Sequence, residues 1–490
     1  MNKIFKVVWS KTKECYVVVS EVAKNNGGKK KALASVLAGL AMVAAAGTMG
    51  TPVQAGSDLG NSSVNISPNG TYNGSNSVSQ NSVVVGFQNN TTGGSGNGHI
   101  IYGANNTATQ DSSLAIGNQN TSTGPASTAI GVGSQATGRN TIAMGNVAKA
   151  NKADNIAIGT YSEALTSGQD AYALAMGSYS KANAHMAVGI GAIANATGTE
   201  STAVGAGSTA SGKNSQTLGA RNTASGQNST AIGHSNKAEG LNAVAIGESN
   251  TSKVEDTITV GTSNTASVGG GIAIGQNNLA NSGGNAGNTM IAIGRENEAT
   301  AQDTVAIGRK TKATANVSVA LGARSEATGS GAIAIAGNGD GFKTTSTGTG
   351  SIAIGMQSNS TGTASTAVGG VAQATAKGAS ALGFKAEATA ESATALGQES
   401  NASIKDGVAL GSYSKTSIDK GIKGFNPAED RTNKYGGLTG NVQTSTLAAV
   451  SVGDGDNATR QITGLAAGTA DSDAVNVAQL RSVNLKYAGD

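Results

Sequence analysis

The chain has 490 residues, of which 72 are glycine and four are proline, and its formal net charge is +4. Aromatic residues make up 3% and charged residues 13%. Four prolines exclude a collagen helix, and the low charge argues against simple disorder. A globular core rich in large side chains is excluded as well. A fold of small residues and many tight turns, such as a solenoid of short strands, is favoured.

Residues 1–55 read as a secretion signal. Three lysines at 29–31 precede an uncharged apolar run over 32–49, and small residues follow up to Ala55. This pattern predicts cleavage after Ala55 and removal of the segment. The long front of the segment, Met1–Ser10, resembles the extended signal-peptide region of large autotransporters.

The basic charge belongs to this signal. Residues 1–55 contain eight lysines and two glutamates, a net +6, so the rest of the chain carries −2. A nucleic-acid partner is therefore not expected. Cys15, the single cysteine, leaves with the signal, so neither disulfides nor thiolate chemistry are expected in the mature chain.

One short motif repeats along the body of the chain. An apolar–Ala–apolar–Gly motif ends at Gly117, Gly131, Gly145 and Gly159. We count 23 copies of this motif, including looser ones that end at Gly86 and Gly103. The repeat length is fourteen residues, the distance from Gly117 to Gly131, and 15 of the 22 spacings between motif glycines have this length. In this count Gly189 and Gly337 are motif glycines. Fourteen residues suit two short strands and two turns, stacked as coils of a solenoid.

The alternation inside each motif predicts which side chains face inward. Residues two apart share one face of a strand, so the larger apolar residues are expected to fill the coil. Ala148 and Ala150 represent the inward residues of the second strand. The predicted repeat core is Ile116, Ile130, Met144, Ile158, Ile232, Ile246, Ile274 and Ile307. The predicted turn glycines, where positive φ is cheap, are Gly117, Gly131, Gly145, Gly159, Gly233 and Gly247.

The repeats, exemplified by residues 141–150, resemble the heads of YadA-like trimeric autotransporter adhesins. The resemblance implies an all-β, left-handed parallel β-roll, homotrimeric, followed by a connector, a neck and a stalk. Residues 459–468 and 470–480 resemble the family's neck, with Arg460, Gln461, Ile462, Asp473, Val475, Asn476, Val477 and Leu480 at its motif positions.

The resemblance divides the chain into six parts. These are a cleaved extended signal peptide (1–55), a lead-in (56–80), the β-roll head (81–411), a head-to-neck connector (412–454), a neck (455–482) and the start of a stalk or another module (483–490). Family members end in a C-terminal outer-membrane anchor, which does not follow here, so we expect a fragment of a longer protein rather than an anchorless head. Outer-membrane insertion would need that anchor.

Catalytic patterns are weak. His99, His185 and His234 are scattered and are expected at the surface or in turns, so no metal site is predicted. Two Ser-x-x-Lys sequences, at 178–181 and 412–415, fall at the same position of the repeat, so we interpret them as part of the repeat and not as catalytic motifs. The chain is predicted not to be an enzyme and to need no cofactor.

Insertions interrupt the repeat after Gly159, Gly275 and Gly337. Each coil must close within one repeat, so extra residues bulge outward. We take Leu165, Asn285, Phe342 and Lys343 as candidate ligand-binding residues, with tolerated loop drift as the alternative.

The resemblance implies export to the bacterial cell surface and adhesion. The expected partners are two further copies of the chain, and matrix proteins of the collagen, fibronectin or laminin class or a host cell surface. The alternative is a self-associating or shielding coat without a specific host ligand.

Overall fold

The computed structural model describes residues 5–10, 15–20, 64–66, 81–91, 97–167, 171–281, 289–337, 339, 341–425 and 440–487. The apolar run of the signal and the predicted cleavage site at Ala55 lie outside the described residues. Within the signal, strands β1 (Phe5–Ser10) and β2 (Cys15–Ser20) pair antiparallel.

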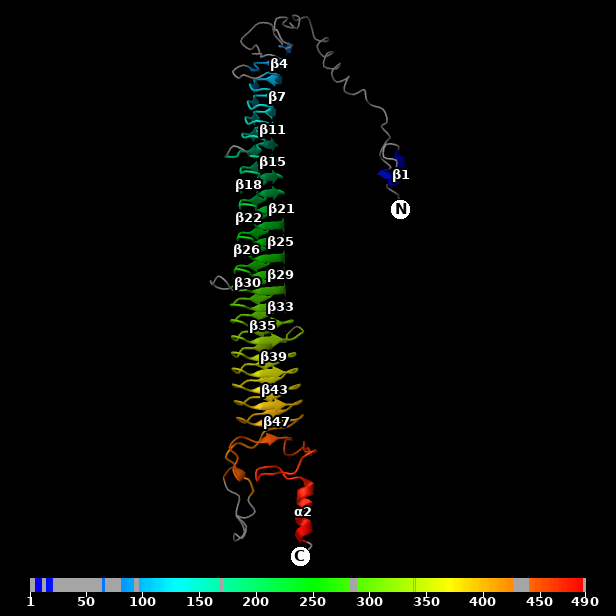
Figure 1. Cartoon of the computed structure of the whole chain (residues 1–490), viewed down its shortest axis with the longest axis vertical. Helices are drawn as coiled ribbons and strands as arrows, with labels where there is room; N and C mark the ends of the chain where they lie inside the picture. Colours follow the sequence, from blue (N-terminus) through cyan, green and yellow to red (C-terminus); the bar gives the residue numbers. More distant parts are fainter. Residues whose placement is uncertain are drawn as a thin grey trace.

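The described residues between 81 and 416 form a rod of stacked coils, and the described residues of the predicted connector and neck follow at its C-terminal end (Figure 1). Each coil contributes one strand to a first parallel sheet and a shorter strand to a second, and strands of successive coils pair in register, as Ile142 does with Ile156.

The first sheet contains β3 (Val64–Ile66), β4 (Val83–Phe87), β5 (Ile100–Ala104), β7 (Leu114–Asn118), β9 (Thr128–Val132), β11 (Ile142–Asn146), β13 (Ile156–Ile158), β15 (Leu174–Met176), β17 (Val188–Ile190), β19 (Thr202–Val204), β21 (Gln216–Ala220), β23 (Thr230–His234), β25 (Val244–Glu248), β27 (Ile258–Thr262), β29 (Ile272–Gln276), β31 (Ile291–Arg295), β33 (Val305–Arg309), β35 (Val319–Leu321), β37 (Ile333–Ile335), β39 (Ile352–Ile354), β41 (Thr366–Val368), β43 (Ser380–Leu382), β45 (Thr394–Leu396), β47 (Val408–Leu410) and β48 (Val450–Ser451).

The second sheet contains β6 (Thr107–Ala108), β8 (Thr121–Ser122), β10 (Gln135–Ala136), β12 (Lys149–Ala150), β14 (Glu163–Ala164), β16 (Lys181–Ala182), β18 (Asn195–Ala196), β20 (Thr209–Ala210), β22 (Thr223–Ala224), β24 (Lys237–Ala238), β26 (Thr251–Ser252), β28 (Thr265–Ala266), β30 (Leu279–Ala280), β32 (Glu298–Ala299), β34 (Lys312–Ala313), β36 (Ser325–Ala327), β38 (Thr344–Ser346), β40 (Asn359–Ser360), β42 (Gln373–Ala374), β44 (Glu387–Ala388) and β46 (Asn401–Ala402).

The two ends of the first sheet lie outside the segment predicted as the head. Strand β3, in the predicted lead-in, pairs with β4. Strand β48, in the predicted connector, pairs with β47 through Val408 and Val450. The sheet is thus extended at both ends by segments that carry no repeat motif.

The interior of the coils is filled by small residues, which corrects the predicted core. The central residue of the motif is buried and is an alanine in most coils, as at Ala143, Ala157 and Ala245. The larger flanking residues point outward and are half-buried or exposed in the chain. This holds for all eight predicted core residues: Ile116, Ile130, Met144, Ile158, Ile232, Ile246, Ile274 and Ile307. The alternation was right and its phase was wrong, because a shift of one residue moves every side chain to the other face. On the second strand Ala148 and Ala150 do point inward.

The motif glycines sit where neighbouring coils come closest. At Gly117 φ is +123°, and a Cβ there would lie 1.9 Å from the carbonyl oxygen of Gly131 in the next coil. Any other residue would therefore clash with backbone as well as strain its own conformation. The other predicted turn glycines also have positive φ: Gly131 (131°), Gly145 (143°), Gly159 (132°), Gly233 (116°) and Gly247 (118°).

The register corrects two of the counted motif glycines. Gly189 pairs with Ala203 and occupies the place of a buried alanine, so Gly191, with φ +128°, is the motif glycine of that coil. In a later coil Leu321 pairs with Ile335, which puts Ala336 rather than Gly337 at the motif position. With these shifts the regular spacing is broken at four places: Gly86 to Gly103, Gly159 to Gly177, Gly275 to Gly294 and Ala336 to Gly355.

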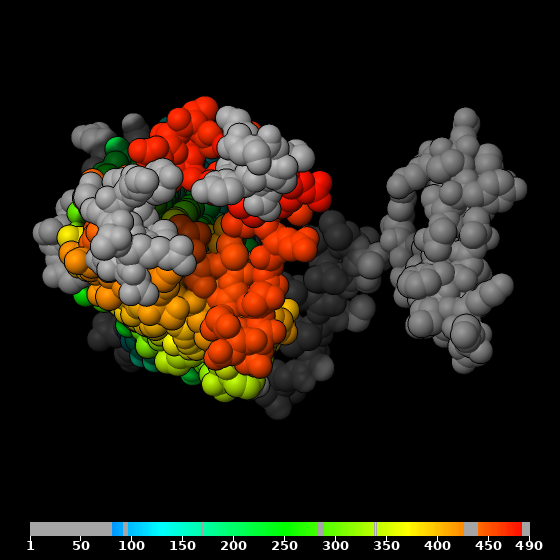
Figure 2. Space-filling view, turned by 90° about the horizontal axis from the view of Figure 1, so that it is seen from below, coloured from blue at the N-terminus to red at the C-terminus, as the bar shows by residue number. Residues whose placement is uncertain are grey.

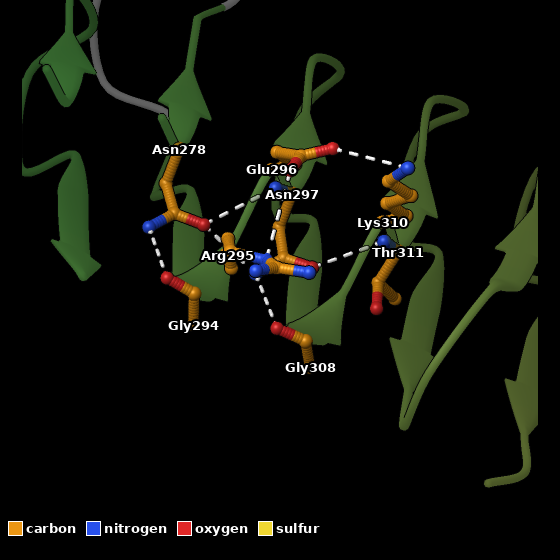
Figure 3. Close-up of polar contacts among 8 residues, drawn as sticks. All are labelled: Asn278, Gly294, Arg295, Glu296, Asn297, Gly308, Lys310 and Thr311. Carbon is orange, nitrogen blue, oxygen red and sulfur yellow. Dashed lines mark hydrogen bonds and ion pairs between the residues drawn. The ribbon is translucent and has the colours of Figure 1, made fainter. Parts of the chain in front are cut away.

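A ladder of buried asparagines runs along one inner corner of the rod. In one rung, Asn297 Nδ2 lies 2.8 Å from the Oδ1 atom of Asn278 in the preceding coil and 2.8 Å from the carbonyl oxygen of Gly308 in the following coil (Figure 3). The backbone N–H of Asn297 also donates to Asn278 Oδ1. Each amide thus satisfies the polar groups that three coils bring into the dry interior. The longest run comprises Asn222, Asn236, Asn250, Asn264, Asn278 and Asn297.

Replacing one rung of this ladder should open the roll locally. Asn250→Leu removes the acceptor of Asn264 and the donor to Gly261, and each buried polar group left unsatisfied costs about 1–3 kcal/mol. Asn250→Ser should cost less, because the naturally equivalent Ser134 donates to the Gly145 carbonyl oxygen at 2.6 Å. Hydrogen exchange should report lost protection over residues 236–278 in the leucine variant and native protection over 383–411. Equal protection in both variants would mean that the ladder does not stabilise these coils.

Candidate functional surface

The three predicted loops differ in what they expose. Leu165 is half-buried, and its backbone N–H donates to Asn183 Oδ1 in the next coil at 3.2 Å. Asn285 lies outside the described residues. Phe342 is 47% exposed, and the Nζ atom of its neighbour Lys343 lies 2.6 Å from Glu326 Oε1. Of these candidates, only Phe342 and Lys343 present accessible side chains from the described part of a loop.

The outer surface carries columns of residues that repeat from coil to coil. In the column of the second sheet that contains Glu163 the charges alternate in sign, since Glu163 lies between Lys149 and Lys181, at 3.9 and 3.6 Å. Such exposed pairs contribute little individually, but they align neighbouring coils.

An aromatic pair was missed by the sequence reasoning. Tyr161 and Tyr179 each follow their motif glycine by two residues, and their rings stack with centroids 5.1 Å apart. On the same coils Tyr172 meets His185 edge to face at 6.4 Å. The signal was available, since aligning residues by distance from the motif glycine places Tyr161 and Tyr179 in one column.

The prediction for the histidines is wrong for one of three. His185 and His234 are exposed, but His99 is fully buried, and its Nδ1 atom lies 2.8 Å from Ser113 Oγ. His99 occupies the inward position that serine, threonine or alanine fills in most other coils, and that Asn155 and Met290 fill in theirs. In the part of the chain that the structure describes, no group of three or more His, Cys, Asp or Glu side chains is placed to hold a metal ion.

The connector and neck are joined to the last coil by Arg460. Its guanidinium donates to Ser414 Oγ at 3.0 Å and to the carbonyl oxygens of Ser412 and Val452. One side chain therefore ties together coil, connector and neck. Seen from below, connector and neck residues, orange to red, lie at the C-terminal end of the rod (Figure 2).

The neck leads into a capped helix, α2 (Val477–Tyr487), after a short 3₁₀ helix, η2 (Gly440–Val442), in the connector. Asn476 Oδ1 accepts from the Gln479 N–H at 3.0 Å, and Gln479 Oε1 accepts from the Asn476 N–H at 3.2 Å. This reciprocal pair is a capping box, which fixes where the helix begins. Among the described residues no helix is both long and apolar enough to cross a membrane.

Several predicted neck residues are exposed apolar side chains. Ile462, Val475, Val477 and Leu480 are each more than 60% exposed in the chain, and Gln461 is exposed too. Asp473 has a different role, since its carboxylate accepts from the N–H groups of Ala470 and Thr469. These hydrogen bonds, that from Ala470 first, lower the pKa of Asp473, because they stabilise the charged form.

Three sequence-family models match the chain. The extended signal peptide of the type V secretion system matches residues 1–48. The YadA head domain repeat matches twelve overlapping segments between residues 103 and 414. The coiled stalk of trimeric autotransporter adhesins matches residues 461–487. Signal, head repeat and stalk therefore occur in one chain and in the family's order.

Two individual proteins are similar to parts of the chain. The autotransporter adhesin BadA of Bartonella henselae is 52% identical over 64 residues, which are 13% of this chain and 2% of BadA. The crystal structure of the collagen-binding domain of Yersinia adhesin YadA is 27% identical, covers 39% of this chain and 86% of its own, and gives a TM-score of 0.25. The chain thus spans a small fraction of the curated relative it matches.

The rod of parallel coils defines a β-solenoid, and the match to an extended signal peptide supports its export. With the family matches, the chain belongs to the YadA-like trimeric autotransporter adhesins. Its coils match the head repeat of that family.

Acid should weaken the neck through Asp473. Because its pKa is lowered in the folded chain, the stabilisation is complete above the ordinary value of 3.8 and is lost as pH falls through the folded pKa. Thermal unfolding of the neck should therefore lose more stability between about pH 5 and pH 2 in the parent than in Asp473→Asn. Asp471→Asn, which removes a carboxylate two residues away, is the matched control. An identical acid dependence in parent and Asp473→Asn would contradict this role.

Proposed function

We propose that the chain is the head of a homotrimeric bacterial surface adhesin that binds host matrix proteins or host cells multivalently. The observation that carries the trimeric part of the proposal is the outward apolar column of the first sheet. Ile116, Ile130 and Met144 follow one another in register on successive coils, and isoleucines hold the same place further along the rod. A long exposed apolar surface is a feature of interaction sites.

Two further copies of the chain are the occupants of this column. Three rods side by side would bury one apolar column each around a shared axis, which is the association that the family name describes. The exposed neck side chains Ile462, Val475 and Leu480 would be covered by the same assembly. The same trimer would then remove the apolar surfaces of both the head and the neck from water.

Polar replacements in the apolar column should weaken the trimer without unfolding the coils. Each fully buried isoleucine contributes about 1.5–3 kcal/mol, so the triple variant Ile232→Ser/Ile246→Ser/Ile274→Ser should dissociate at lower temperature and higher protein concentration than the parent. Sedimentation and thermal unfolding measure this. Thr223→Ser/Lys237→Ser/Thr251→Ser, on the outer face of the second sheet, is the control and should leave the trimer unchanged.

A substitution inside the coil should have the opposite effect, because it should destabilise the coil itself and not the contact between subunits. Ala245→Leu overfills a fully buried position and should cost about 1–3 kcal/mol within the coil itself, with lost hydrogen-exchange protection near residue 245. If the serine variant lost protection in the same way while its trimer stayed intact, the isoleucine column would not be the subunit interface.

Matrix proteins of the collagen, fibronectin or laminin class, or host cells, are the proposed ligands, and the family resemblance supports them. The repeated outer columns of three chains offer many equivalent contacts, so avidity should exceed single-site affinity by about 10²–10⁴.

The purified trimeric head should bind at least one of these proteins immobilised on a surface. The dissociated serine variant should bind it more than tenfold more weakly, because avidity is lost. Binding of the head only to other heads would instead favour the self-associating coat.

A further inference from the structure

Three of the eight arginines of the chain lie in three consecutive coils, Arg295, Arg309 and Arg324. Arg295 and Arg309 are Cα partners on β31 and β33. Lys310 donates its backbone N–H to the Arg295 carbonyl, and Arg324 donates to that of Arg309. All of them follow a motif glycine by one or two residues, so they lie at one corner of the rod.

A fifth cation continues the series across the insertion. Thr344 pairs with Ser325, so Lys343 holds in its coil the place that Arg324 holds in the preceding one. We call Arg295, Arg309, Lys310, Arg324 and Lys343 the basic strip. It ends beside the exposed ring of Phe342.

The neighbouring column shows how this repeat ordinarily arranges charge. There Glu298, Lys312 and Glu326 alternate in sign in register, with Lys312 Nζ 3.1 Å from Glu298 Oε2. Opposite charges on adjacent strands attract and like charges repel. The basic strip departs from that rule, because Arg309 lies over Arg295 and Arg324 over Lys310, although Glu296 precedes Lys310 at the same repeat position.

Carboxylates lie beside the basic strip and hold its side chains at this corner. Glu296 Oε1 lies 3.6 Å from Arg295 Nε, and Glu296 Oε2 lies 3.5 Å from Lys310 Nζ (Figure 3). Glu326 contacts Lys343. The two pairs of Glu296 are exposed and contribute little individually, so a ligand with many negative charges can displace them. Residues 295–326 hold five basic and four acidic side chains, a net +1, whereas the chain beyond residue 55 carries −2.

We propose that the basic strip binds a linear sulfated polysaccharide of the glycosaminoglycan type. Its cations repeat along the rod axis at about 4.8 Å per coil, which suits a linear polyanion better than a single anion. Guanidinium groups bind sulfate-like oxyanions in a bidentate manner, and the Phe342 ring offers an apolar surface to a sugar. A nucleic acid fits less well, since base stacking uses successive aromatic side chains and the basic strip has one beside it.

The inference deepens the proposed adhesin function and rests on it. Glycosaminoglycan chains belong to the same host surfaces as matrix proteins. In a trimer, three basic strips would engage one polysaccharide or several, with the gain in avidity that multivalency gives.

Heparin is the probe for the test, with the full-length trimeric head as the protein. Arg309→Gln/Arg324→Gln should lower heparin affinity more than tenfold at about 0.15 M salt. It should also reduce the slope of log affinity against log salt by about two, because two ionic contacts are lost. Arg309→Lys/Arg324→Lys should keep the slope but lose part of the affinity, since lysine cannot bind sulfate in a bidentate manner. Arg139→Gln/Arg221→Gln removes the same charge elsewhere on the rod and should bind as the parent does.

Four results would overturn the proposal. They are equal weakening by the control pair, equal affinity for desulfated heparin, equal or tighter binding of double-stranded DNA, and a loss of trimer stability in Arg309→Gln/Arg324→Gln with heparin binding unchanged. The last would mean that the basic strip pairs with a neighbouring subunit. Sedimentation and circular dichroism of each variant separate lost binding from lost folding.

Binding to immobilised matrix proteins, measured in parallel, separates this proposal from the adhesin function. A head that binds matrix proteins but not heparin contradicts only the basic strip. A head that binds neither contradicts both.

Discussion

The narrow space between the two sheets is the constraint on which the rest of the structure depends. So short a coil brings its two strands so close that alanine, serine, threonine and asparagine fill most of the interior. Ala143 and Ala245 are completely buried, and at Gly117 even one added methyl group would overlap the next coil. Most larger apolar side chains therefore lie outside the coil and gather on the outer face of the first sheet, with Val84, Ile101 and Met290 as buried exceptions.

Because the interior is both thin and polar, hydrogen bonding replaces much of the stabilisation that a thick core would supply. The asparagine ladder does this along one corner, where each side chain serves backbone groups in neighbouring coils. Serine and threonine take over where asparagine is absent, as Thr311 does by donating to the Gly322 carbonyl at 2.6 Å. Contacts reach only the adjacent coils, so the rod is nearly one-dimensional. Its ends are covered by β3 and by β48, the latter held in place by the Arg460 cluster.

This architecture separates folding from recognition. Inward positions vary little, because volume and hydrogen bonding restrict them. Outward positions change from coil to coil without disturbing the stack, giving the stacked tyrosines at Tyr161 and Tyr179, the alternating charge column at Glu298 and Lys312, and the basic strip. An adhesin head of this kind can acquire ligands by changing columns while the interior stays the same.

The sequence by itself determined the repeat, its length, the parallel solenoid and the family, because spacing and motif order are properties of the chain alone. It also located the loop that exposes Phe342 and Lys343. The tertiary structure decided which face of each strand is inside, since alternation with a period of two has no preferred phase and the greater hydrophobicity of Ile246 pointed to the wrong one. It also decided the register at Gly191 and Ala336 and the burial of His99. These depend on how closely one coil packs on the next, a distance that no single repeat contains.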